Sequence, residues 1–311
     1  MAAVTAAMVK ELREITGAGM MDCKKALTET GGDMDKAVDF LREKGLAGAA
    51  KKAGRVAAEG MVVTAMTADS KTAVVVEVNA ETDFVAKNEK FQNFAADVAA
   101  QALNSDTADM DSFMEEKWAK DPSLTVKEAL SSQISIIGEN MNIRRFVKVT
   151  EADGFIASYM HAGGKIGVLI DVVTNVENDA VKEMAKNVAM QAAALKPQFT
   201  GRDEVDAEFI EKEKEILAAA ARNEKPDAND KIIEGMVMGR ISKELKEICL
   251  LDQVYVKAED GKQSVAQYVA QVAKENGAAI KIKKFVRFET GEGIEKKSED
   301  FAAEVAKQMG V

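Results

Sequence analysis

The chain has 311 residues, 47% hydrophobic and 30% charged, a composition typical of a globular protein of roughly two or three domains. Its formal net charge of −10 argues against direct binding to a nucleic-acid phosphate backbone and favours a basic or mixed-charge protein partner. Because no run approaches the ~18 apolar residues of a membrane span and the start lacks a secretion-signal pattern, we expect a cytoplasmic protein that does not enter a membrane.

Groups suited to catalysis or metal binding are scarce. The single histidine, His161, excludes any mechanism that needs two imidazoles, and Cys23 and Cys249 stand too far apart to form a Cys-x-x-Cys pair. Gly164-Lys165 is followed by isoleucine, so it is not a phosphate-binding loop. The sequence therefore predicts no catalytic residue, no cofactor and no metal site.

Residues 1–55 are expected to form a three-helix module. Apolar residues recur at helical spacing in three short stretches that are separated by glycines, and Asp33 is a natural N-cap for the third. Each helix is too short to be stable alone, so the three must share a core. The three stripes are Val4, Met8, Leu12 and Ile15; Cys23 and Leu27; and Met34, Ala37, Val38 and Leu41.

Met20 and Met21 are adjacent in the second of these helices. Neighbouring helical residues point about 100° apart, so both side chains cannot enter a small core equally well. Methionine suits an adaptable contact surface, but it also fills gaps in cores, and both interpretations remain open.

An internal repeat begins at Gly60. Residues 60–102 align without gaps to residues 154–196, and both copies read as strand, turn, strand, loop and helix. We infer an α+β fold with two related subdomains, each an antiparallel hairpin backed by a helix: residues 56–153, and residues 154–195 together with 250–292. The identical pairs include Gly60/Gly154, Lys71/Lys165, Val74/Val168, Val78/Val172 and Ala99/Ala193.

The connection between the second strand and the helix of the first copy contains Asp83 and Phe84. Asn88 is a plausible N-cap for the helix that follows. Phe84 lies seven residues before Phe91 and could share its buried face, or it could face a partner from the loop. In the second copy Glu177-Asn178 takes the place of Asp83-Phe84, which favours a contact role because the sister unit does without the aromatic ring.

The second copy carries His161 at its hairpin tip, beside glycines, where exposure and a contact role are reasonable. Residues 103–150 join the copies, and Trp118 in this insert is interpreted as a packing anchor. Residues 196–249 predict an inserted antiparallel helical hairpin. Strands are expected at Gln253–Val256 and Ile280–Phe288, with a helix between them at Ser264–Lys274. Residues 293–311 are expected to form a terminal module with a helix at Asp300–Gln308.

Several long motifs in this order resemble elongation factor Ts, the guanine-nucleotide exchange factor for the GTPase elongation factor Tu. The likeness extends from end to end. The motifs are TGAGMMDCKKAL at Thr16–Leu27, TDFVAK at Thr82–Lys87, NIRR at Asn142–Arg145, the segment from Ser158 to Gly163, and the segments Gly291–Glu295 and Phe301–Val305.

The resemblance implies specific roles. The first three helices would be a ubiquitin-associated-like module that docks on the GTPase through Arg13, Met20 and Met21. The position of His161 would meet another GTPase domain. The loop Thr82, Asp83, Phe84 and Val85 would lie beside the Mg²⁺ and phosphate site of the partner and promote exchange of GDP for GTP, with no enzymatic reaction.

Two other classes remain open. A non-catalytic adaptor could use the helical head to bind partners without changing nucleotide release, although this would leave the duplicated core unexplained. An enzyme could use Asp83 with Glu81, but the sequence offers neither a second catalytic group nor a cofactor motif.

Overall fold

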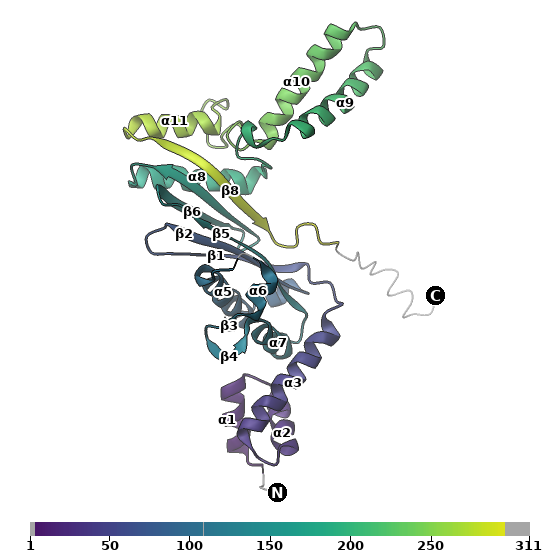
Figure 1. The fold of residues 1–311 in the computed structure, drawn as a ribbon, viewed down its shortest axis with the longest axis vertical. Helices are drawn as coiled ribbons and strands as arrows, with labels where there is room; N and C mark the ends of the chain where they lie inside the picture. The colour runs from purple at the N-terminus through teal and green to yellow at the C-terminus, as the bar shows by residue number, and fades with distance from the viewer. Residues whose placement is uncertain (1–3, 108, 296–311) are drawn as a thin grey trace.

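The computed structural model describes residues 4–107 and 109–295, and the expected helix at Asp300–Gln308 lies outside this range. The molecule is elongated (Figure 1): three helices form one end, two stacked sheets with their helices form the middle, and a helical hairpin forms the other end. The described part of the chain is therefore mixed helix and antiparallel strand, which confirms the expected α+β class.

The helical head consists of α1 (Ala6–Thr16), α2 (Met20–Glu29) and α3 (Met34–Lys52). Asp33 caps α3 as expected, accepting from the backbone N–H of Lys36. Leu12, Cys23 and Leu27 are fully buried. Ile15, however, is 59% exposed, so its assignment to the buried stripe was wrong: Val9 occupies the core instead.

Helix α3 extends beyond the head and packs on α7 (Val126–Ile137). Gly45 lies against the main chain of Ser131, and Arg42 Nη2 lies 3.1 Å from Glu128 Oε1. The head is thus joined to the middle of the molecule by helix packing as well as by the chain.

The first sheet has the order β1-β2-β5 and is antiparallel, with β1 (Glu59–Met66), β2 (Thr72–Ala80) and β5 (Met141–Thr150). The expected hairpin therefore gains a third strand. One face of β2 packs on α5 (Glu89–Asn104) and α7, and the other faces the second sheet. The side chains on the helical face include Val74, Val76 and Val78; those on the other include Ala73 and Val75.

The second sheet repeats this arrangement. It has the order β6-β7-β8, with β6 (Gly154–His161), β7 (Ile166–Thr174) and β8 (Ile280–Glu289), and α8 (Asp179–Leu195) covers its outer face. Both middle strands carry a register shift at the same place in the repeat, after Glu77 in β2 and after Asp171 in β7. The repeat found in the sequence is thus a structural duplication, extended by β5 and β8.

The two sheets contact each other reciprocally. The backbone N–H of Val62 donates to the carbonyl of Gly164, and that of Ile156 donates to the carbonyl of Ser70, both at 2.7 Å. Residues 62 and 156, and residues 70 and 164, are repeat equivalents, so the contacts are related by an approximate twofold axis. The turn at residues 162–165 is thereby fixed against β1.

The insert between the copies contains α6 (Met110–Glu115) and a small hairpin of β3 (Lys117–Trp118) and β4 (Asp121–Thr125). Trp118 is 6% exposed and its ring lies 5.7 Å from that of Phe94. The interpretation of Trp118 as a packing anchor is confirmed.

The helical hairpin is formed by α9 (Ala207–Glu224) and α10 (Asp230–Ile248) after a short 3₁₀ helix (Arg202–Glu204), and α11 (Val265–Glu275) follows. The strand expected at Gln253–Val256 was wrong, because only an isolated bridge links Val254 to Ser264. Gln253 is buried for another reason: its amide donates to the carbonyl of Glu247 at 2.7 Å.

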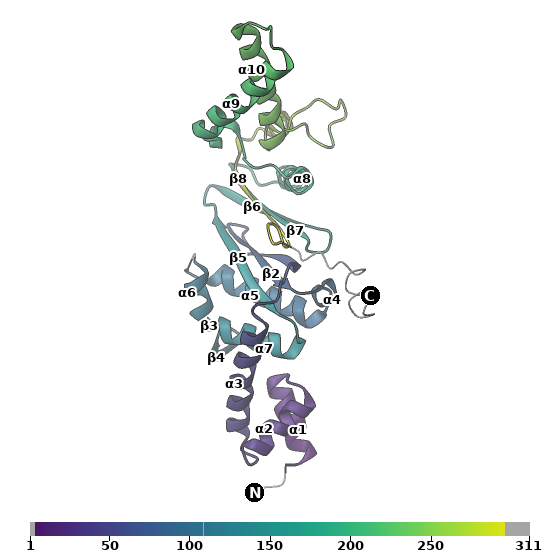
Figure 2. The same cartoon turned by 90° about the vertical axis from the view of Figure 1, so that its right-hand side faces the viewer.

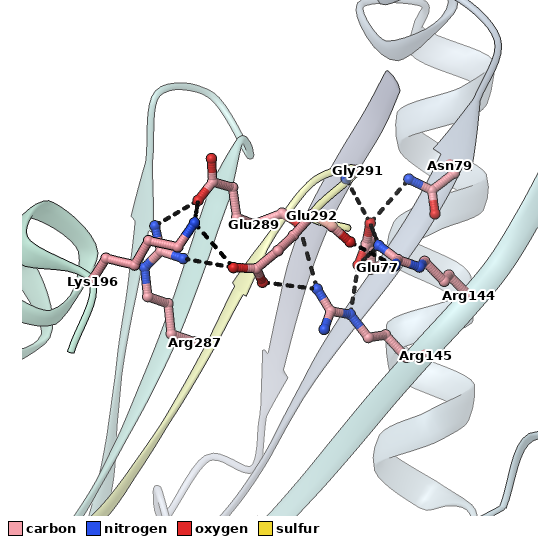
Figure 3. Close-up of polar contacts among 9 residues, drawn as sticks. All are labelled: Glu77, Asn79, Arg144, Arg145, Lys196, Arg287, Glu289, Gly291 and Glu292. Carbon is pink, nitrogen blue, oxygen red and sulfur yellow. Dashed lines mark hydrogen bonds and ion pairs between the residues drawn. The ribbon is translucent and has the colours of Figure 1, made fainter. Parts of the chain in front are cut away.

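Glu77 and Asp171, the buried acids at the two register shifts, differ in the hydrogen-bond donors around them. Glu77 accepts from Arg144, Arg145, Asn79 and the backbone N–H of Gly291, the last at 2.8 Å (Figure 3). Burial opposes its ionisation, but these donors together hold the pKa of Glu77 below its ordinary value. The network fixes the chain after β8 against the first sheet.

Asp171 has no such donors. It is 1% exposed, and neither carboxylate oxygen accepts a hydrogen bond from any described residue; Lys283 Nζ lies 3.9 Å away. Burial, then the neighbouring Glu151, raises the pKa of Asp171 to about 6, while a hydrogen bond from Lys283 lowers that of Glu151 to about 2. Lys284 and Asp153 are further charges near this pair.

Asp171→Asn is expected to stabilise the protein above pH 6. The folded wild-type carboxyl holds a proton between about pH 4 and 6 that the unfolded chain has lost, so its contribution to stability falls as pH rises through this window. Urea unfolding should show a variant advantage that grows from near zero below pH 4 to about 3 kcal/mol at pH 8. An advantage independent of pH would contradict the assignment.

Candidate functional site

Phe84 projects from α4 (Asp83–Ala86), a four-residue helix that directly follows β2. Thr82 caps this helix by accepting from the backbone N–H of Val85 at 3.3 Å, and Val85 packs against the first core. The Phe84 side chain is 81% exposed, the highest value among the exposed large hydrophobic residues of the described chain. The core interpretation of Phe84 is therefore excluded, and the ring is available to a partner.

Asp83 lies beside Phe84 and is ionised at neutral pH. Lys87 Nζ lies 2.7 Å from its carboxylate, and this hydrogen bond holds the pKa of Asp83 below its ordinary value. Glu59 and Lys165, which form an ion pair of 2.7 Å, are close enough to act on the charge of Asp83. Lys165 belongs to the β6–β7 turn, so α4 and this turn lie at the same end of the stacked sheets.

His161 is the last residue of β6 and is exposed. Its Nδ1 lies 3.0 Å from the Tyr159 hydroxyl, which fixes the orientation of the ring. The turn that follows needs left-handed backbone at three successive residues, Ala162, Gly163 and Gly164. Gly164 also packs closely on Met61, where an added Cβ would lie 3.1 Å from the methionine methyl group.

The helical head presents a second apolar surface. Met20 is 59% exposed and Met21 is 73% exposed, both in the first turn of α2, and Arg13 is exposed in the last turn of α1. The gap-filling alternative is thus excluded for both methionines. Figure 2 shows α1 and α4 on the same side of the long axis of the molecule.

Groups for chemistry do not gather at these surfaces. No cluster of three His, Cys, Asp or Glu side chains suited to a metal ion occurs in residues 4–107 and 109–295. Glu81, which a carboxylate enzyme would need, is held by the backbone N–H of Asn140 at 2.5 Å and by Arg55 at 3.4 Å. Burial raises the pKa of the Cys249 thiol to about 11, so it is unreactive.

None of the helices that the structure describes is long and apolar enough to cross a lipid bilayer.

Sequence reasoning selected the exposed side chains of Phe84, His161 and the two methionines, whereas Thr82, Asp83 and Val85 are only partly exposed. It missed Glu139, which accepts two hydrogen bonds from Thr82. The polar turn Gly138-Glu139-Asn140 between a helix and a strand was the available signal, but it did not indicate which segment the turn would contact. The candidate site is therefore a set of exposed contact surfaces on a duplicated core.

The comparisons with known proteins give the family. The model of the family described as Elongation factor TS matches residues 81–292. The chain is 56% identical to elongation factor Ts of Clostridium novyi over 307 residues (98% of this chain, 99% of that protein) and 55% identical to that of Clostridioides difficile over 309 residues (99% and 100%). The chain therefore belongs to the elongation factor Ts family and is a translation elongation factor.

Proposed function

We propose that this chain binds the GTPase elongation factor Tu in the cytoplasm and promotes exchange of GDP for GTP without a chemical step of its own. The observation that carries the proposal is the 81% exposure of Phe84 on a capped helix. Membership of the family supports the choice of partner. The Met20–Met21 surface and the His161 turn supply further contacts.

The proposed contacts follow the division of the chain made from the sequence. Residues 1–55 dock on the GTPase, residues 56–153 carry Phe84, and residues 154–195 with 250–292 carry His161. The hairpin (196–249) and residues 293–311 complete the molecule.

The mechanism that we propose is displacement. Mg²⁺ requires near-ideal octahedral oxygen ligands and links the nucleotide phosphates to the GTPase, so small movements of its surroundings weaken GDP binding strongly. Insertion of the Phe84 ring next to this site would bury its apolar surface and contribute about 2 to 3 kcal/mol of binding free energy. This corresponds to about two decades of GDP affinity.

One side chain does not suffice for exchange, because the complex must also form. Docking of the helical head and of the duplicated core would supply the remaining free energy. Linkage then requires that GDP weaken the binding of this chain to the GTPase by the same factor as the chain weakens the binding of GDP.

Stopped-flow release of a fluorescent GDP from elongation factor Tu, with and without this chain, tests the proposal. Acceleration that saturates with factor concentration is expected. Binding without acceleration would instead support the adaptor with a ubiquitin-associated-like head.

Met20→Ala and Met21→Ala are each expected to weaken the complex with elongation factor Tu by about fivefold or more. Their side chains are already largely exposed, so burial is gained only in the complex and the melting temperature should change by about 1 °C or less. Calorimetric titration and thermal melting measure the two effects. Met238→Ala, at a 54% exposed methionine of the hairpin, is the matched control. Equal losses of affinity and stability would mean that Met20 and Met21 pack within their own molecule.

A further inference from the structure

The turn between α7 and β5 holds the base of α4. Glu139 accepts two hydrogen bonds from Thr82: the backbone N–H donates to Oε2 at 3.0 Å, and the hydroxyl donates to Oε1 at 2.7 Å. The Thr82 hydroxyl oxygen also accepts from the backbone N–H of Val85. A continuous chain of hydrogen bonds therefore runs from Glu139 through the N-cap into the helix that carries Phe84.

The next residue holds the neighbouring position. Asn140 is 2% exposed, and its backbone N–H donates to Glu81 Oε1 at 2.5 Å. Its side-chain amide donates to the carbonyl of Arg55, in the segment that leads from α3 to the first sheet, at 2.7 Å. The same turn thus contacts both the start of α4 and the connection to the helical head.

The duplication separates framework from function in this turn. The pairing of β2 with β5 and of β7 with β8 makes Asn140 equivalent to Ala279 and Glu81 equivalent to Asn175. The backbone N–H of Ala279 donates to Asn175 Oδ1 at 2.8 Å, so the contact between Asn140 and Glu81 occurs in both copies. It belongs to the shared framework.

The contact made by Glu139 occurs in only one copy. The equivalents of Glu139 and Thr82 are Ala278 and Val176, which have no carboxylate and no hydroxyl to pair. In that copy Asn178 caps α8 directly, with no short helix before it. The Glu139–Thr82 contact is present where Phe84 is present and absent where Phe84 has no counterpart.

We propose that Glu139 is a positioning residue, which fixes α4 so that Phe84 is presented in one orientation before the partner arrives. This inference rests on the proposed function and deepens it. A four-residue helix is not stable by itself, and the exposed pair Asp83–Lys87 contributes little. Fixing α4 in advance removes an ordering cost that would otherwise be met after docking, when the Phe84 ring enters the GTPase.

A double-mutant cycle tests this role with the full-length chain and elongation factor Tu. Glu139→Ala is expected to lower the maximum rate of GDP release by about fivefold, close to the value of one helix cap. The concentration for half-maximal stimulation should stay within about twofold, because the docking surfaces are untouched. In a Phe84→Ala background the same change should have no further effect.

Two further variants exclude a merely structural role. Glu139→Gln keeps a carbonyl oxygen that can accept from Thr82, so it should restore most of the rate. Gln267→Ala is the matched control, because Gln267 also accepts from the backbone N–H of an N-cap residue, Ser264 at 2.8 Å, at the start of α11. It should lower the melting temperature without changing the maximum rate.

The outcomes are distinct. A normal rate for Glu139→Ala, additive losses in the cycle, or an equal loss of rate in Gln267→Ala would overturn the positioning role while leaving the proposed function in place. Unchanged release for Phe84→Ala would overturn both.

Discussion

Phe84→Ala is expected to lower the stimulated rate of GDP release from elongation factor Tu by about 30- to 150-fold. The ring is 81% exposed, so its apolar surface is buried only against the partner. Removing the ring should therefore destabilise the transition state for GDP release by roughly 2 to 3 kcal/mol. The measurement is stopped-flow release at saturating factor. Melting should be unchanged, since α4 keeps its cap and Val85 keeps its packing.

Two controls sharpen this experiment. Phe84→Leu retains most of the apolar volume and should retain part of the rate. Ile232→Ala removes a 48% exposed apolar side chain from the helical hairpin and should leave GDP release unchanged. Full stimulation by Phe84→Ala would contradict displacement by the ring, and a loss of cooperative melting would show that the ring packs within its own molecule.

Glu77→Gln is expected to destabilise the folded protein by about 3 kcal/mol at pH 7. The substitution leaves Arg144 and Arg145 without their buried charge partner, at contacts of 3.0 and 2.6 Å in the wild type. Because the pKa of Glu77 is lowered in the folded state, its contribution is present above the unfolded pKa and is lost as pH falls through the folded pKa. Urea unfolding at pH 7 and at pH 4 should show the larger loss at pH 7.

Asp171→Asn is the matched control, because Asp171 occupies the equivalent position in the second copy. Like Glu77→Gln, this substitution replaces a carboxylate with an amide. Its expected effect has the opposite sign at neutral pH. Loss of stability by both variants at pH 7 would mean that Asp171 is held as an ion by its surroundings, against the absence of donors from the described residues.

Glu77 also holds the segment that follows β8. The backbone N–H of Gly291 donates to Glu77, and an added Cβ on Gly291 would lie 2.1 Å from the carbonyl oxygen of Ala58. The chain therefore passes too close to the first sheet for any side chain at this position. Arg144 Nη2 also donates to the carbonyl of Glu292 at 2.6 Å, next to this close approach.

Features governed by near neighbours in the sequence could be predicted. The caps by Asp33 and Asn88, the helical hairpin and the duplicated strands follow from side chains within a few residues of one another, and each was confirmed. The absence of Phe84 from the second copy already favoured exposure, because duplicated cores need the same packing. Ile15 was misplaced since periodicity places a residue on a face of a helix but does not say how far the core extends along it.

Features that join distant segments required the tertiary structure. Glu139 meets Thr82 across 57 positions and Arg144 meets Glu77 across 67, and nothing in either local sequence indicates its partner. The same holds for β5 and β8, which complete sheets whose other strands lie far away in the chain. The sequence alone thus determined most of the helices, the repeated hairpins and the exposed candidates for contact. Only the fold decided that Glu77 accepts hydrogen bonds from two arginines, that Asp171 accepts none from the described residues, and that Glu139 accepts from Thr82, because these contacts depend on which side chains the sheets bring within hydrogen-bonding distance.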